Sequence, residues 1–350
     1  MLSWLFGKKP NPKVVVCPFC GQDNPLESNQ PEVGRTALAC SGCGQSIPMR
    51  YLQETLRLTN PSQRIWPVTA PIVGFPQSGK SIFIQGLTHV LLESKNPSVL
   101  VTACNQESSD FLSEIYSQLN ANKPAVPTDW GDEKCYFMRM DQLPLWDSRF
   151  VVFRDVPGEA YQDYQIREEQ AKFCVSSRCA IFIIYLDQKF EDEKGMKLWW
   201  QILEKYETTL IEKGCDIASE GRKGIVVLVQ ADKLVGLPAH LREYLNNDPI
   251  RQKIDGREPR IDMSTNAGME TYLEEMRRAS ASIRQWVAEN RDGGDKLVTR
   301  ANLMKMQLEF CLISAWGAEP DKTRGEVPPR PMRVLDPLFW LLEFHSKRAN

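Results

Sequence analysis

The sequence predicts an α/β fold in which a mostly parallel sheet carries helices on both faces, with a small cysteine-rich module at the N-terminus. Apolar, β-branched runs at residues 178–187 and 224–234 are typical of strands buried on both faces of a parallel sheet. Stretches with helical periodicity, such as residues 109–119 and 270–289, separate such runs, as in a succession of strand–helix–strand units. Two closely spaced pairs of cysteines before residue 44 mark the separate module.

Length and charge limit the possible functions. At 350 residues the chain is long enough for one large domain and a small one. Its 43 basic and 45 acidic residues exclude the global basic field of a dedicated nucleic-acid binder, so any contact with nucleic acid must be local. No apolar run approaches the roughly eighteen residues of a membrane-spanning helix, and residues 1–6 are too short for a signal peptide. We therefore expect no transmembrane segment and a cytoplasmic location.

The first module has the ligand spacing of a zinc ribbon. Cys17 and Cys20 form one C-x-x-C-G knuckle, and Cys40 and Cys43 form a second. Two residues between cysteines allow both sulfurs to meet one metal, and two knuckles complete a closed tetrahedral site, so we expect a structural Zn²⁺. A pair of redox C-x-x-C motifs is the alternative, although redox motifs normally occur singly within a βαβ unit. The segment between the knuckles has few basic or aromatic residues, so binding of nucleic acid by the ribbon is possible but not indicated.

The exit from this module is polar. Residues 51–63 are rich in turn formers, which predicts a boundary near residue 60. We therefore expect a zinc ribbon and linker in residues 1–60 and the α/β domain in residues 61–350.

The α/β domain begins with a phosphate-binding loop. Residues 74–81 fit the pattern G-x-x-x-x-G-K-[ST] at every fixed position, between an apolar run at 65–73 and a helical stretch at 82–92. The glycines of such a loop let backbone N–H groups turn toward phosphates, and the following helix points its positive end at them. A chance match in a surface turn is the alternative, which the order of strand, loop and helix disfavours. Two prolines at positions 67 and 71 are unusual for a central strand.

Each residue type in the loop has an expected role. Lys80 supplies charge to the β- and γ-phosphates, and the Ser81 hydroxyl coordinates Mg²⁺. The loop residues predicted to contact the nucleotide are Gly74, Gln77, Ser78, Gly79, Lys80 and Ser81. The sequence thus predicts a binding site for a nucleoside triphosphate with Mg²⁺.

A second motif ends a later strand. The apolar run at 148–154 leads into Asp155, and Gly158 and Glu159 follow closely. Beside a phosphate loop, such an Asp orients a Mg²⁺-bound water, and the glycine N–H bonds the γ-phosphate. The alternative is an ordinary turn at the end of the strand, without a role in nucleotide binding. Asp187 ends the buried run at 178–187 and is the rival Mg²⁺ acid of an ATPase-type site, but no glycine follows it in the same way.

The loop at 122–130 offers the remaining Mg²⁺ ligand. Thr128 is the candidate there, and its backbone N–H could also sense the γ-phosphate. An ordinary loop threonine is the alternative.

Base recognition is predicted at Asp232, just past the end of a buried strand. Asp232 follows the run at 224–234, and its carboxylate can accept hydrogen bonds from N1 and the 2-amino group of guanine. Residues 306–313 predict the last strand, ending at Ser314 and Ala315.

Residues 237–265 are polar and predict a surface insertion. A final helix after Asp336, its expected N-cap, is predicted to pack on the sheet, with a membrane-lying helix as the alternative.

In this order, the motifs resemble those of GTPases of the translation-factor and Ras class. The resemblance covers roughly residues 64–345 and includes the phosphate loop, similar to G-x-P-N-x-G-K-S, and residues 155–158, which match D-x-P-G. Ser314 and Ala315 match the family's S-A pair, which contacts the base. With its N-terminal ribbon and its Asp-Pro-Leu-Phe-Trp-Leu-Leu ending, the chain further resembles the double-GTPase group of bacterial conflict systems.

The resemblance implies a GTP-binding and GTP-hydrolysing switch that uses Mg²⁺ and acts through a protein partner. Lys80, Thr128 and Glu159 are its catalytic candidates, and Ser81, Thr128 and Asp155 its Mg²⁺ set. The sequence departs from the family at residues 229–230, where Val-Gln replaces [NT]-K, and at Glu159, where Ras-like proteins carry a water-orienting Gln. A nucleotide-binding scaffold without turnover and a P-loop ATPase are the alternative functions.

Overall fold

A computed structural model gives the fold, and the chain divides into two units, Met1–Pro67 and Val68–Asn350. The residues that the structure describes are 13–26, 38–58, 64–93, 99–121, 134–156, 173–186, 190–192, 195–197, 199–317 and 330–346.

In residues 13–26, 38–58 and 64–67, the first unit consists of two short antiparallel ladders and one helix. The strands are β1 (Lys13–Val16), which pairs with β2 (Asp23–Leu26), and β3 (Leu38–Ala39), which pairs with β4 (Ser46–Ile47); the helix is α1 (Met49–Arg57). Helix α1 corrects the expectation of a turn-rich exit, because Tyr51, Leu52 and Thr55 bury one of its faces. The side chain of Tyr51 donates to the carbonyl of Ile65 over 2.7 Å.

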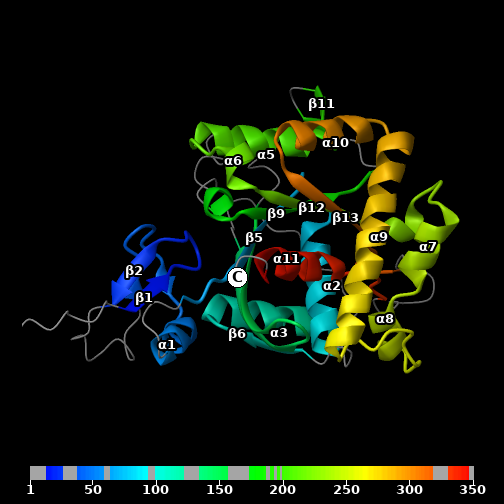
Figure 1. The fold of residues 1–350 in the computed structure, drawn as a ribbon. Coiled ribbons are helices and arrows are strands. Elements are labelled where there is room, and N and C mark those ends of the chain that lie inside the picture. Colours follow the sequence, from blue (N-terminus) through cyan, green and yellow to red (C-terminus); the bar gives the residue numbers. More distant parts are fainter. Residues whose placement is uncertain are drawn as a thin grey trace, which may run out of the picture. The chain divides into compact units, whose positions relative to one another are not determined.

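The second unit is built on a seven-stranded, mostly parallel sheet, as the sequence predicts (Figure 1). The strand order is β13-β12-β9-β5-β8-β7-β6, and β7 runs antiparallel to both β6 and β8. The strands are β5 (Val68–Val73), β6 (Leu100–Ala103), β7 (Lys134–Leu143), β8 (Asp147–Asp155), β9 (Cys179–Ile184), β12 (Lys223–Leu228) and β13 (Gln307–Leu312). A separate short hairpin joins β10 (Phe190–Asp192) and β11 (Gly195–Lys197).

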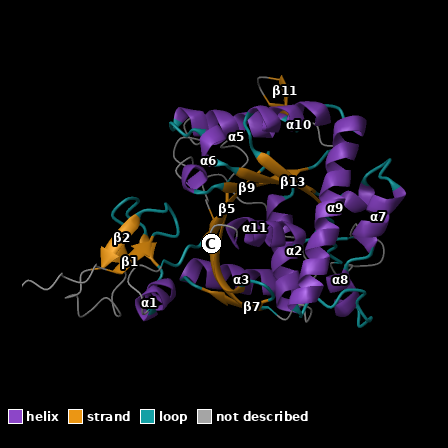
Figure 2. Cartoon of the chain, viewed as in Figure 1, coloured by secondary structure: helices purple, strands orange, loops and turns teal. Residues whose placement is uncertain are grey.

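Helices cover both faces of this sheet (Figures 1 and 2). Their bounds are α2 (Lys80–Glu93), α3 (Gln106–Asn120), α5 (Gln201–Glu212), α6 (Ile217–Glu220), α7 (Ala239–Asn246), α8 (Pro249–Ile254), α9 (Asn266–Asn290), α10 (Gly294–Leu303) and α11 (Asp336–Ser346), with the 3₁₀ turn η2 at Ala231–Lys233. Successive residues of β12 alternate between two cores: Ile225 packs with residues of α2 and α11, whereas Val226 packs with residues of α5 and α10. This alternation is why the buried strands are apolar throughout.

The edge strand β13 is covered by α9. Ser280 on α9 accepts a hydrogen bond from the Phe310 N–H over 2.8 Å and donates to Glu309 over 2.7 Å. The helix therefore covers one edge of the sheet and satisfies one of its polar groups.

Two local expectations change in the structure. Residues 237–265 are not simply a surface insertion, because they form α7 and α8 and bury Leu241, Leu245 and Ile250 in the cores. Pro71 does lie in the central strand β5, whose pairing with β9 starts only at Ile72, directly after the proline. The ladder to β9 thus avoids the residue that cannot donate.

Within the described parts of the chain, no helix is both long enough and apolar enough to span a membrane.

Candidate functional site

The central strand β5 lies where the direction of chain progression across the sheet reverses. After β5 the chain forms β6, β7 and β8 on one side, and then β9, β12 and β13 on the other. In open α/β sheets, ligands bind outside the carboxyl ends of the strands at such a reversal. The phosphate-loop sequence leaves β5 at this point.

The loop at residues 74–79 is tightly folded. Gly74 lies so close to its surroundings that a Cβ there would be 2.5 Å from the Ser78 hydroxyl and 2.9 Å from the Ile183 carbonyl. Gln77 and Gly79 adopt positive φ angles of 60° and 94°. Gly74 is therefore required by close approach, and Gly79 by its backbone conformation.

Polar groups gather in and beside this loop. The Lys80 ammonium donates to the carbonyls of Gly74 over 3.0 Å and Phe75 over 3.2 Å, and its side chain is buried. The Ser78 hydroxyl is buried and has no hydrogen-bond partner among the described residues. Helix α2 starts at Lys80, so the N-terminal end of the helix, with Ser81 in its first turn, borders the loop. This arrangement fits a polyanion, since it provides an ammonium, an unsatisfied hydroxyl and a helix N-terminus.

Asp155 lies next to the phosphate-loop strand. It ends β8 opposite Ile72 of β5 in the parallel register, and its side chain is fully buried. The backbone N–H of Val156 donates to the Ile72 carbonyl over 3.3 Å, which extends the pairing beyond β8. A buried carboxylate two residues before Gly74 in the register has the donor chemistry that Mg²⁺ prefers.

Two of the residues predicted to recognise the base are in direct contact. Asp232 lies on η2 after β12, and its carboxylate accepts a hydrogen bond from the Ser314 hydroxyl over 2.5 Å. The Ser314 hydroxyl also accepts from the Gly317 N–H over 3.1 Å. Backbone bonds join the strand ends behind them: Ala231 N–H donates to the Ile313 carbonyl over 3.0 Å. Residues 82 apart in sequence thus form one hydrogen-bonded unit.

Ala315 and Val229 join this unit to the phosphate loop and its helix. A Cβ on Gly86 of α2 would lie 2.7 Å from the Ala315 carbonyl, so the helix and the loop after β13 approach closely. A Cβ on Gly79 would lie 3.7 Å from the Val229 side chain. Val229 therefore packs beside the phosphate loop as an apolar side chain. It stands where the GTPases that the sequence resembles carry Asn or Thr.

Some predicted residues cannot be placed. Thr128, Gly158, Glu159 and the rival acid Asp187 lie outside the described residues. The structure therefore brings together the phosphate loop, Asp155, Asp232, Ser314 and Ala315 at one edge of the sheet, and the proposed hydrolytic residues stay predictions.

The four cysteines of the first unit form one cluster. The sulfurs of Cys17, Cys20, Cys40 and Cys43 all lie within 4.8 Å of one another. Two of the separations are 3.8 Å, for Cys17–Cys43, and 3.5 Å, for Cys20–Cys40. Tetrahedral Zn²⁺ with four thiolates requires sulfurs about 3.8 Å apart, so the donor set and its geometry fit this ion.

The two knuckles repeat the same backbone pattern. The N–H groups of Phe19 and Gly42 donate to the sulfurs of Cys17 and Cys40 over 3.4 and 3.3 Å. Gly21 and Gly44 both have a φ of 73°. The glycine after each pair is therefore needed to turn the chain under the sulfurs.

Asn24 adds an outer contact to the cysteine cluster that the sequence did not reveal. Its buried amide donates to the Cys40 sulfur over 3.6 Å and to the Gln22 carbonyl over 2.8 Å, and its oxygen accepts from the Ser41 N–H over 2.8 Å. Outer contacts of this kind orient metal ligands. No motif links Asn24 to the cysteines, so only the fold shows the contact.

Comparisons with known proteins give the following. Neither a protein-family model nor a curated protein matches the sequence. Among solved structures, the chain is similar to the signal recognition particle receptor SRb-GTP/SRX complex from Chaetomium thermophilum, with 13% identity, a TM-score of 0.34, and coverage of 73% of this chain and 93% of that chain.

It is also similar to the S. cerevisiae Ski7 GTPase-like domain. The structure with GDP and inorganic phosphate gives 13% identity and a TM-score of 0.35, and the structure with GTP gives 14% and 0.33. Both matches cover 80% of this chain and 50% of the Ski7 chain, so this chain spans about half the length of those two. The likeness concerns the fold alone.

Proposed function

We propose that the second unit binds a guanine nucleotide with Mg²⁺ and hydrolyses GTP as a molecular switch. The observation that carries the proposal is the contact between Asp232 and Ser314 at the sheet edge that also bears the phosphate loop and Asp155. The phosphate loop and Asp155 follow β5 and β8, Asp232 and Ser314 follow β12 and β13, and only β9 lies between these two pairs of strands. A dedicated site for phosphates alone or for a base alone would not need both pairs.

The described residues have defined roles in this proposal. The Gly74 and Phe75 carbonyls hold the Lys80 ammonium at the loop, from where it can bind the β- and γ-phosphate oxygens. The Ser314 hydroxyl orients the Asp232 carboxylate, which then accepts from the guanine N1–H and 2-amino groups. The Ser81 hydroxyl and Asp155 hold Mg²⁺, directly or through water, and the ion neutralises charge on the phosphates when bound.

Hydrolysis and switching involve residues that extend the proposal further. Thr128 would complete the Mg²⁺ shell, the Gly158 N–H would bind the γ-phosphate, and Glu159 would position water. A carboxylate near a polyanion suits this task less well than an amide, so we expect slow turnover without a partner. Loss of the Thr128 and Gly158 contacts on hydrolysis would change which protein partner is held.

Turnover is tested by phosphate release from the full chain with GTP and Mg²⁺. Lys80→Ala removes a charge-assisted interaction, so we expect nucleotide affinity to fall roughly ten- to hundredfold and turnover to disappear. Nucleotide binding by the wild-type chain with no phosphate release, alone or with a partner, would instead support the non-hydrolysing scaffold. Displacement of bound fluorescent GTP analogue equally well by ATP would support the ATPase alternative.

We further propose that the first unit holds one structural Zn²⁺ through Cys17, Cys20, Cys40 and Cys43. The sulfur separations support this, and the closed set of four thiolates leaves no position for a substrate. With reduced thiols, GTP and Mg²⁺ as its requirements, we place the protein in the cytoplasm. The sequence resemblance to double-GTPases suggests a role in a bacterial conflict or defence system, in which the ribbon would serve as a dock for the protein partner.

A further inference from the structure

The loop that carries Ser314 is backed by a second chain segment. Ser314 and Met332 form an antiparallel bridge in which the two N–H groups donate over 3.1 and 2.8 Å. The Arg330 N–H donates to the Trp316 carbonyl over 2.6 Å. A Cβ on Gly317, whose φ is 78°, would lie 1.9 Å from the Arg330 carbonyl. Residues 314–317 therefore cannot shift independently of residues 330–332.

The backing segment is fixed in turn by Arg333, which is fully buried. Its N–H donates to the Asp248 carboxylate over 2.6 Å. Its guanidinium donates to the carbonyls of Tyr244 and Asn247, each over 2.9 Å, and pairs with Glu275 over 2.8 Å. These partners come from α7, from the turn before α8, and from α9.

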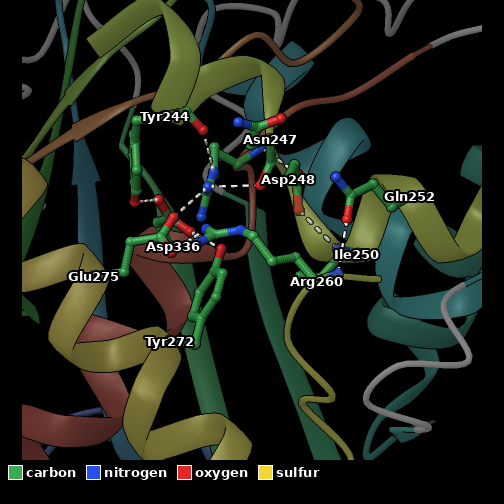
Figure 3. Close-up of polar contacts among 10 residues, drawn as sticks. Tyr244, Asn247, Asp248, Ile250, Gln252, Arg260, Tyr272, Glu275 and Asp336 are labelled. Carbon is green, nitrogen blue, oxygen red and sulfur yellow. Dashed lines mark hydrogen bonds and ion pairs between the residues drawn. The ribbon is translucent and has the colours of Figure 1, made fainter. Parts of the chain in front are cut away.

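Two tyrosines and Asp336 complete the cluster around Arg333. Figure 3 labels these three residues together with Asn247, Asp248 and Glu275. The guanidinium carbon lies 3.8 Å from the ring centre of Tyr244 and 5.3 Å from that of Tyr272. The hydroxyls of these two tyrosines donate to the two oxygens of Asp336, each over 2.5 Å. The same two tyrosines therefore contact both Arg333 and Asp336, which lie at either end of the turn into α11.

This cluster stabilises the protein core less well than apolar side chains would. Arg333 has a φ of 55°, and its Nη1 atom has no hydrogen-bond partner among the described residues. Burying charged groups costs free energy that apolar side chains of similar volume avoid, and a non-glycine residue with positive φ adds strain. Stability alone does not account for such an arrangement. A requirement to hold the backbone of residues 330–332 in one position would account for it.

We propose that Arg333 is a positioning residue for base recognition: it fixes residues 330–332, which hold Ser314 against Asp232. The inference rests on the proposed binding of guanine at Asp232. Through Arg333, which lies outside the base-recognition pair, α7, the turn before α8, and α9 would influence nucleotide selectivity.

The test compares affinities of the full chain for GTP and ATP by competition with a fluorescent nucleotide. Arg333→Lys keeps the charge but loses the planar fork and the stacking on the tyrosines. We expect the affinity ratio of GTP to ATP to fall about tenfold, with ATP affinity little changed, because only guanine uses Asp232. Circular dichroism checks that the variant is folded. Tyr272→Phe removes one hydroxyl from Asp336 and keeps the ring, so a smaller loss, about threefold, is expected.

The second unit supplies a matched control in Arg222. This arginine is also buried, and it donates to the carbonyls of Cys174, Val175 and Ser177. None of these groups belongs to residues 314–317 or to the segment 330–332 that backs them. Arg222→Lys removes a comparable buried fork, so a general loss of packing would lower the GTP to ATP ratio in this variant as well. We expect its ratio to stay within about twofold of wild type.

A double variant shows whether Arg333 acts through Asp232. If it does, Asp232→Ala with Arg333→Lys has the same ratio as Asp232→Ala alone, because the second change has nothing left to misplace. Additive losses contradict the inference, as does an unchanged ratio in folded Arg333→Lys. If Arg333→Lys does not fold, an unchanged ratio in Tyr272→Phe contradicts it instead. A wild-type chain without preference for GTP overturns the proposed guanine site, and the inference with it. A wild-type chain that prefers GTP, with an unchanged ratio in Arg333→Lys, overturns the inference alone.

Discussion

The two units of this chain reach a defined structure by different means. Among its described residues, the first has four short strands, one helix and a small set of buried apolar side chains: Val15, Val16, Phe19, Leu26, Ile47, Tyr51 and Leu52. The second buries both faces of a seven-stranded sheet in two large cores. A small unit cannot bury enough apolar surface to hold its fold alone, so a metal or an equivalent crosslink has to supply the difference. The larger unit can include costly polar clusters at places where geometry matters.

The comparison predicts its largest effect for metal removal. In zinc-finger peptides the apparent binding free energy of structural zinc is about 10–16 kcal/mol, so Cys17→Ser with Cys40→Ser should unfold the first unit. The second unit should keep its nucleotide affinity. Metal analysis should show a loss of about one equivalent of zinc, and limited proteolysis should show cleavage restricted to the first unit.

Cys104→Ser is the matched control, because Cys104 lies on the second unit, outside the cysteine cluster. It should retain the metal. Full zinc content in the Cys17, Cys40 double variant would show that the cluster is not the metal site.

The two units should also respond oppositely to pH. Burial raises the pKa of Asp336 to about 7, although Arg333 and the two tyrosine hydroxyls oppose this shift. The folded second unit therefore retains a proton that the unfolded chain releases near pH 4. Its stability from this group is greatest below pH 4 and falls as pH rises toward 7, by at most about 1.4 kcal/mol per pH unit. In the first unit, acid should weaken the proposed binding of Zn²⁺, because protons compete for the thiolates.

Urea unfolding of the second unit at several pH values measures this effect. Asp336→Asn cannot titrate, so it should flatten the dependence between pH 4 and pH 7. An unchanged slope in this variant would assign the dependence to other groups.

A smaller effect on GTP affinity is expected from a substitution at Gly86, where α2 approaches Ala315. Glycine in a helix interior is usually destabilising, so Gly86→Ala would ordinarily stabilise α2 by roughly 0.5–1 kcal/mol. Here the added Cβ would lie 2.7 Å from the Ala315 carbonyl, so Ala315 has to move. We expect a loss of GTP affinity of about tenfold, of the order set by other displaced contacts. A gain in thermal stability with unchanged GTP affinity would contradict the close approach.

Much of this arrangement could be predicted from the sequence because its signals are local. The phosphate loop, the cysteine knuckles and the apolar strands each depend on residues within a short window. The contact between Asp232 and Ser314 was not predicted; it results from the parallel pairing of β12 with β13, which brings the carboxyl ends of these strands together. The fold class is confirmed by the seven-stranded sheet.

The remaining features arise from packing between distant segments. Asp336 was expected only as a helix cap, but its two oxygens accept hydrogen bonds from Tyr244 and Tyr272. The cluster around Arg333 spans α7, α9 and the turn before α11, and no residue spacing announces it. Helices α7 and α8 were missed for a related reason, since their few apolar residues become significant only when they meet the core.

The central claim is that Asp232 reads guanine at the edge of the sheet that binds phosphates. Xanthine carries an oxygen where guanine carries the 2-amino group, so it requires a donor where guanine requires an acceptor. The most direct measurement is therefore the affinity of Asp232→Asn for GDP and for xanthosine diphosphate, compared with wild type. We predict that wild type prefers GDP and that Asp232→Asn prefers xanthosine diphosphate. Equal binding of GDP by wild type and Asp232→Asn, with no gain for xanthosine diphosphate, would contradict the account.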